Sequence, residues 1–92
     1  MHEMGIASSV LDAVHKELRR YPGQRATKVG LRIGEFAGVD GESLRFCFDV
    51  LVKDTDFAPL ALEIEATHGE ELDFAYLELE SSETKYAQEV AV

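Results

Sequence analysis

A strand, helix, strand order in the middle of the chain is the feature that most restricts the fold. Residues 27–33 and residues 60–66 each alternate apolar with polar side chains, which is typical of strands with one buried face. Residues 41–52 instead carry apolar side chains at three- and four-residue steps, the spacing of an amphipathic helix. Because two strands joined by a crossover of this length run in the same direction, we expect a parallel pair with a right-handed connection.

The segment before the first strand predicts another amphipathic helix. Its apolar residues recur at helical spacing; they are Met4, Ala7, Val10, Leu11, Val14 and Leu18. The run Tyr21-Pro22-Gly23 ends this helix, because proline cannot continue the hydrogen-bond ladder and glycine suits the turn that follows. His15 lies among the polar positions, and we expect it to be exposed.

The end of the chain adds further strands. Residues 67–71 predict a turn, and residues 72–80 return as a strand whose alternation changes phase near Tyr76, which indicates a bulge or an end of pairing. Residues 85–92 predict a last, more polar strand. The order α-β-α-β-β-β therefore indicates an α+β fold, with two helices packed on a small mixed β-sheet and residues 1–92 forming a single domain.

The middle helix has a defined start and one expected apolar face. Asp40 occupies the N-cap position, where a carboxylate can accept hydrogen bonds from the first backbone N–H groups. The apolar face comprises Leu44, Cys47, Phe48 and Leu51, joined by Phe46 and Val50. Cys47 is interpreted as a small core residue and not as a nucleophile, since no motif around it supplies a base.

Composition excludes several classes of function. The formal net charge is −9; residues 1–53 carry seven acids and eight bases, whereas residues 54–92 carry eleven acids and one base, so nucleic-acid binding is not expected. No apolar run could span a bilayer and no signal-peptide pattern opens the chain, so we expect a cytoplasmic protein without membrane contact. The single cysteine, Cys47, excludes an internal disulfide and a thiolate-rich zinc site.

Met1, His2 and Glu3, at the start of the first helix, form a candidate metal site. The first amides of a helix have no intrahelical partner. The α-amine of Met1, the His2 amide and a His2 ring nitrogen could form two adjacent chelate rings around Ni(II) or Cu(II), which favour square-planar nitrogen coordination. Glu3 or another carboxylate could complete the site. The alternative is an ordinary terminal segment in which Glu3 only complements the helix dipole.

Several motifs together resemble the HypA/HybF family of nickel-insertion proteins. They are Met1-His2-Glu3-Met4, Ile33-Gly34-Glu35, Gly38-Val39-Asp40, residues 42–49 and Leu62-Glu63-Ile64-Glu65. The resemblance extends from residue 1 to about residue 67. It implies two helices against a small mixed sheet. It also implies Ni(II) held through His2 and neighbouring amine and backbone nitrogens, with Glu3 and Asp40 as candidate oxygen ligands and Asp40 acting first as a helix cap.

The resemblance breaks off after Thr67. Members of this family insert there a separate zinc module built on paired Cys-x-x-Cys motifs, whereas this chain passes directly through residues 68–71 into Leu72. No zinc is therefore expected. His68 stands at the point of truncation, and both interpretations stay open: a solvated turn residue or a replacement for a lost ligand.

The function implied by the resemblance is that of a non-enzymatic nickel metallochaperone. It would act in maturation of nickel-iron hydrogenase, with urease as another target, and its partners would be a HypB-type GTPase and a hydrogenase large-subunit precursor. A homodimer is left open. The alternative is a metal-free interaction or regulatory module that retains the fold and docks the maturation partner. An enzyme is the least favoured class, because no Ser/His/Asp or Cys/His arrangement and no glycine-rich phosphate loop are evident.

Overall fold

The structure, a computed structural model, describes residues 2–81. Its elements follow the order α1 (Glu3–Leu18), β1 (Gln24–Gly34), α2 (Gly41–Val52), β2 (Ala61–Thr67) and β3 (Leu72–Ser81). This order confirms the α+β class and the first five of the six predicted elements. The last predicted strand, residues 85–92, lies outside the described residues, as does Met1.

The sheet has the strand order β2-β1-β3. β1 pairs with β2 in parallel and with β3 in antiparallel, so the predicted parallel pair and the mixed character of the sheet are confirmed. Gly30 pairs with Tyr76 and Leu31 pairs with Phe74, which leaves Ala75 as an extra residue on β3. The change of phase predicted near Tyr76 is therefore a β-bulge.

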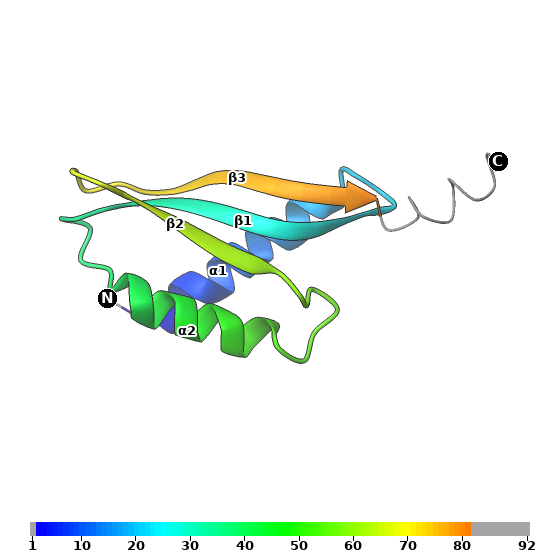
Figure 1. Cartoon of the computed structure of the whole chain (residues 1–92), viewed down its shortest axis with the longest axis horizontal. Coiled ribbons are helices and arrows are strands. Elements are labelled where there is room, and N and C mark those ends of the chain that lie inside the picture. The colour runs from blue at the N-terminus through cyan, green and yellow to red at the C-terminus, as the bar shows by residue number, and fades with distance from the viewer. Residues whose placement is uncertain (1, 82–92) are drawn as a thin grey trace.

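Both helices cover one face of the sheet, as Figure 1 shows. Their apolar sides meet the alternate side chains of β1 that point toward them, and the largest fully buried side chains are Phe48, Leu44, Val14 and Val29. No charged or polar residue is buried within the described part of the chain. The core is thus a single apolar layer between helices and sheet, which is the expected arrangement for an α+β domain of this size.

The predicted apolar face of α2 was too wide. Phe46 is 68% exposed and Val50 is 50% exposed, whereas Leu44 and Phe48 are fully buried. Phe46 and Val50 are four residues apart and so share one side of the helix, which the sheet and α1 do not cover. Cys47 is partly buried against the core, as predicted for a packing residue.

The remaining predictions for the helices are confirmed with one exception. Met4 was expected in the apolar stripe of α1, but it lies in the first turn of the helix and is 45% exposed. His15 is exposed, as expected, and its ring meets the Phe57 ring edge-on at 6.1 Å between centroids. Neither described helix is long and apolar enough to cross a membrane.

The turn between β2 and β3 is tied closely to the segment that follows β1. The Gly34 amide donates to the Glu71 carbonyl at 2.8 Å, and the Glu35 amide donates to the Thr67 carbonyl at 2.9 Å. A Cβ at Gly34 would overlap the backbone of Gly69, so only glycine allows this approach. The short turn predicted at residues 67–71 therefore closes the sheet end directly.

Candidate metal centre

The structure brings together the N-termini of the two helices. Glu3 opens α1, and Asp40 is the N-cap of α2. The Glu3 Oε2 atom accepts a hydrogen bond from the Asp40 amide at 3.0 Å, across 37 residues of sequence. The two carboxylates proposed from the sequence as oxygen ligands are therefore neighbours in space.

Asp40 acts as a helix cap through both carboxylate oxygens. Its Oδ1 accepts hydrogen bonds from the amides of Glu42 at 3.0 Å and Ser43 at 3.3 Å, which confirms the predicted N-cap. Its Oδ2 accepts one hydrogen bond, from the Ser43 hydroxyl at 3.2 Å. Since a carboxylate oxygen has two lone pairs, Oδ2 keeps one acceptor position that the cap does not use.

Hydrogen bonding favours the ionised form of both carboxylates. The bond from the Asp40 amide is the main reason that the pKa of Glu3 lies below its ordinary value. The pKa of Asp40 is also lowered, first by the Ser43 amide and then by the Ser43 hydroxyl. Two anionic groups therefore lie at the positive ends of two helix dipoles, where negative charge is stabilised.

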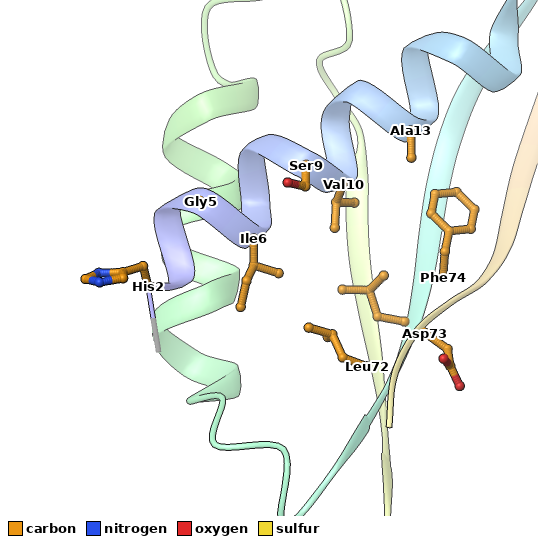
Figure 2. A pocket seen from close by; sticks show the side chains of 10 residues that line it. His2, Gly5, Ile6, Ser9, Val10, Ala13, Leu72, Asp73 and Phe74 are labelled. Carbon is orange, nitrogen blue, oxygen red and sulfur yellow. The ribbon is translucent and has the colours of Figure 1, made fainter. Parts of the chain in front are cut away.

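His2 precedes α1 as its N-cap residue. Its backbone is extended, with φ −86° and ψ 93°, and its carbonyl accepts a hydrogen bond from the Ile6 amide at 3.2 Å. The side chain is exposed and makes no capping hydrogen bond. His2 borders the groove between α1 and β3, and Figure 2 shows its ring pointing away from Leu72 and Phe74. The imidazole is thus accessible from solvent.

The side chains alone do not form a metal cage. Among residues 2–81, no three or more His, Cys, Asp or Glu side chains converge in a way that could hold an ion. The third candidate, Met1, lies outside the described residues. A metal at this terminus would therefore need main-chain or amine nitrogens in addition to side chains, which is the ligand set that the sequence predicted.

His68 lies on the β2–β3 turn, where its Nδ1 atom is 3.7 Å from Glu35 Oε1. The His68 side chain is fully exposed and has no other partner within the described residues. The structure therefore places it beside Glu35 and does not bring it to Glu3 and Asp40 through any contact. The solvated interpretation of His68 suits this position.

Sequence reasoning missed two features of this region. The first is the Ser43 hydroxyl bonded to Asp40, which the spacing of three residues after an N-cap could have suggested. The second is the bond between Glu3 and the Asp40 amide. No local pattern predicts that contact, because it depends on how the two helices pack.

The fold and these residues define a class: a small α+β domain with candidate metal ligands at two adjoining helix N-termini. A family model described as "Hydrogenase/urease nickel incorporation, metallochaperone, hypA" matches residues 1–73. The chain belongs to the HypA family. This confirms the resemblance seen in the motifs. Because the family is one of metallochaperones, it also confirms the prediction of a non-enzymatic protein.

Individual relatives agree with this assignment. The chain is 44% identical over 69 residues to the hydrogenase maturation factor HypA of Pelodictyon phaeoclathratiforme, covering 75% of this chain and 59% of the relative. It is 42% identical over 69 residues to the same factor of an Azoarcus species, covering 75% and 60%. The chain thus spans about 60% of the length of these curated relatives.

A solved structure shares the fold. The solution structure of the Ni metallochaperone HypA from Helicobacter pylori superposes with a TM-score of 0.60, covering 88% of this chain and 97% of that chain. The sequence identity in this comparison is 16%. The superposition therefore supports the two helices and the mixed sheet, and it adds no information on individual ligands.

Proposed function

We propose that this chain is a nickel metallochaperone that takes part in hydrogenase maturation and binds Ni(II) at its amino-terminal residues. The observation that supports this most directly is the contact between Glu3 and the Asp40 amide, which sets two ionised carboxylates beside the start of α1. Membership of the HypA family supports nickel as the cargo. We further propose that the chain acts without a zinc ion, as a single domain.

The proposed ligands are the amine of Met1, the amide and ring of His2, and one carboxylate oxygen. Asp40 Oδ2 is the favoured oxygen, because Oδ1 already carries both backbone bonds of the cap. Glu3 has one oxygen engaged with the Asp40 amide, so it supports the position of Asp40 and offers a second choice of ligand. Nitrogen donors with one carboxylate suit the square-planar preference of Ni(II).

The exposure of this site suits a carrier. His2 is exposed, and the oxygens of Asp40 lie at the surface, so a partner could replace the ligands one after another. A buried cage would not allow such stepwise transfer. The partners we propose, from the family, are a HypB-type GTPase and a hydrogenase large-subunit precursor.

A nickel titration by calorimetry tests this proposal. We expect the His2→Ala variant to lose nickel affinity by at least roughly tenfold, the scale on which metal sites respond to loss of supporting groups. The matched control is His15→Ala, which removes an exposed histidine of α1 that is not a candidate ligand. Affinity should also fall as the pH drops through the range in which histidine takes up a proton, roughly 6 to 7.

Two results would contradict the proposal. If His2→Ala binds nickel as tightly as the unaltered chain, the amino-terminal site is wrong. If neither the unaltered chain nor the His2→Ala variant binds nickel, and a maturation partner still associates in the presence of a chelator, the chain is a metal-free interaction module. The chain spans about 60% of the length of these curated relatives, which makes that second outcome worth measuring.

A further inference from the structure

A tyrosine side chain crosses the face of the sheet that the helices leave uncovered. Figure 1 shows α1 and α2 on one face only. On the other face, Glu63 of β2, Gly30 of β1 and Tyr76 of β3 lie in one row, because Gly30 pairs with both of the others. The Tyr76 hydroxyl donates a hydrogen bond to Glu63 Oε1. One side chain therefore joins the two edge strands across the central strand.

Gly30 provides the space for this crossing. A Cβ built at Gly30 would overlap the Tyr76 ring, so the ring lies directly over the backbone of the glycine. Gly30 is buried, although its neighbours Val29 and Leu31 are the residues that point to the core. A glycine within a strand leaves its backbone bare, and an aromatic ring on the adjacent strand can cover it.

Glu63 is held by two partners on this face. Its Oε1 atom accepts the bond from Tyr76, and its Oε2 atom is 3.6 Å from the Lys28 ammonium group. The Tyr76 bond, followed by the charge of Lys28, lowers the pKa of Glu63. The same bond, followed by desolvation, raises the pKa of Tyr76 to about 12. The phenol donor and the carboxylate acceptor therefore both persist through the neutral range of pH.

A bulge turns Tyr76 onto this face. Phe74 lies opposite Leu31 on the core side, and strict alternation from Phe74 would point Tyr76 to the core as well. Ala75 is the extra residue of the bulge, so Tyr76 instead lies opposite Gly30. The bulge and the glycine thus act on the same side chain.

The rows on either side leave no second place for the ring. Arg32 lies opposite Asp73 in one row, and Lys28 lies opposite Glu78 in the other. A slip of β3 by one residue would exchange its two faces. A slip by two residues keeps the faces, but it sets Tyr76 opposite Arg32 or Lys28, whose long side chains occupy the space above β1. Only the glycine between them accepts the ring.

We propose that Tyr76 is a strap, a side chain that lies over Gly30 and binds Glu63, and that it fixes β3 in one register on the sheet. The family model matches residues 1–73, so it includes Gly30 and Glu63 and ends before Tyr76. The strap therefore fastens residues beyond the family match to the matched domain. It concerns the closure of the sheet and does not depend on nickel binding.

Thermal unfolding of the full chain tests the position of the ring. Gly30→Ala should lower Tm by at least roughly 4 °C, because the new Cβ forces the ring away from Glu63. In a Tyr76→Ala background, Gly30→Ala should leave Tm unchanged or raise it, since the space is then empty and alanine suits a strand better than glycine. A Tyr21→Ala background is the matched control, because Tyr21 is an exposed tyrosine outside the sheet, and there Gly30→Ala should keep its full effect.

A double-mutant cycle tests the hydrogen bond. Tyr76→Phe keeps the ring and removes the donor, whereas Glu63→Ala removes the acceptor. If the two groups act as a pair, the double variant should lose about as much in Tm as Glu63→Ala alone. Additive losses would show that the bond does not join the edge strands. This cycle retains the aromatic ring, so it applies even if Tyr76→Ala does not fold.

Hydrogen exchange followed by NMR tests the effect on the strand. Tyr76→Ala should speed exchange of the β3 amides at least roughly tenfold relative to those of α1, because the strap no longer opposes local opening of the edge. In the unaltered chain, a nuclear Overhauser effect should connect the Gly30 Hα atoms with the Tyr76 ring.

Two results would overturn the proposal. If Gly30→Ala lowers Tm equally with and without Tyr76, the ring does not lie over the glycine. If Tyr76→Ala folds and its β3 amides exchange as slowly as those of the unaltered chain, main-chain pairing alone fixes the strand.

Discussion

Replacing Asp40 in two ways separates its role as a helix cap from its proposed role as a ligand. In Asp40→Asn, an amide oxygen can still accept the bonds from the Glu42 and Ser43 amides, and the new amide N–H can donate to the Ser43 hydroxyl. Asn and Asp are comparable N-cap residues, whereas alanine supplies no acceptor. The two variants therefore differ in the cap but share the loss of the carboxylate.

The expected magnitudes follow from these contacts. In metal-free protein, Asp40→Ala should lower Tm by roughly 5 °C, the usual effect of losing an N-cap in a domain of this length. Asp40→Asn should stay within about 2 °C of the unaltered chain, since both backbone bonds persist. Nickel affinity should fall roughly tenfold in both variants, because each lacks the anionic oxygen that supports the metal.

Thermal unfolding followed by circular dichroism, without nickel, measures the first effect, and calorimetric titration with nickel measures the second. If Asp40→Asn keeps its nickel affinity, Asp40 is not a ligand and Glu3 becomes the candidate oxygen. If Asp40→Ala shows no change in Tm, the capping bonds of Asp40 do not stabilise α2, and the reasoning from the structure is wrong.

Three further predictions concern stability. Phe48→Ala, at a fully buried position, should lower the free energy of unfolding by about 3–5 kcal/mol, whereas Phe46→Ala should change it by less than about 0.5 kcal/mol. Denaturant titration measures both values, and equal losses would contradict the difference in burial between the two side chains. Gly34→Ala should cost about 1–3 kcal/mol, because the new Cβ overlaps the β2–β3 turn; an unchanged Tm would contradict this. The lowered pKa values of Glu3 and Asp40 stabilise the fold above the ordinary values of 4.5 and 3.8, and this contribution is lost as the pH falls through the lowered values. Thermal unfolding of the Glu3→Gln, Asp40→Asn double variant should therefore decline less steeply below about pH 4.5 than that of the unaltered chain.

Most of the secondary structure could be predicted because it follows from local side-chain patterns. The limits of α2, Gly41–Val52, agree with the prediction, since an N-cap and a helical repeat lie within a few residues of each other. The parallel pairing of β1 with β2 followed from the length of the crossover. The bulge beside Tyr76 followed from a change in the alternation of the strand.

The predictions failed where exposure depends on what packs against an element. α2 carries apolar residues around much of its circumference, so its sequence could not show that Leu44 would be buried and Phe46 exposed. The strand pattern of β3 likewise does not show that Leu72 and Phe74 are 39% and 40% exposed beside α1.

The amino-acid sequence by itself determined the order of the elements, the cap at Asp40 and the membership of the HypA family, because each depends on residues close together in the chain or on their order. Only the tertiary structure decided that Glu3 meets the Asp40 amide, and that Leu72 and Phe74 of β3 stay partly exposed in a groove beside α1. The physical reason is that such contacts join residues far apart in the chain, and their partners are set by how helices and strands pack. A sequence pattern describes one element at a time, whereas a site is made where elements meet.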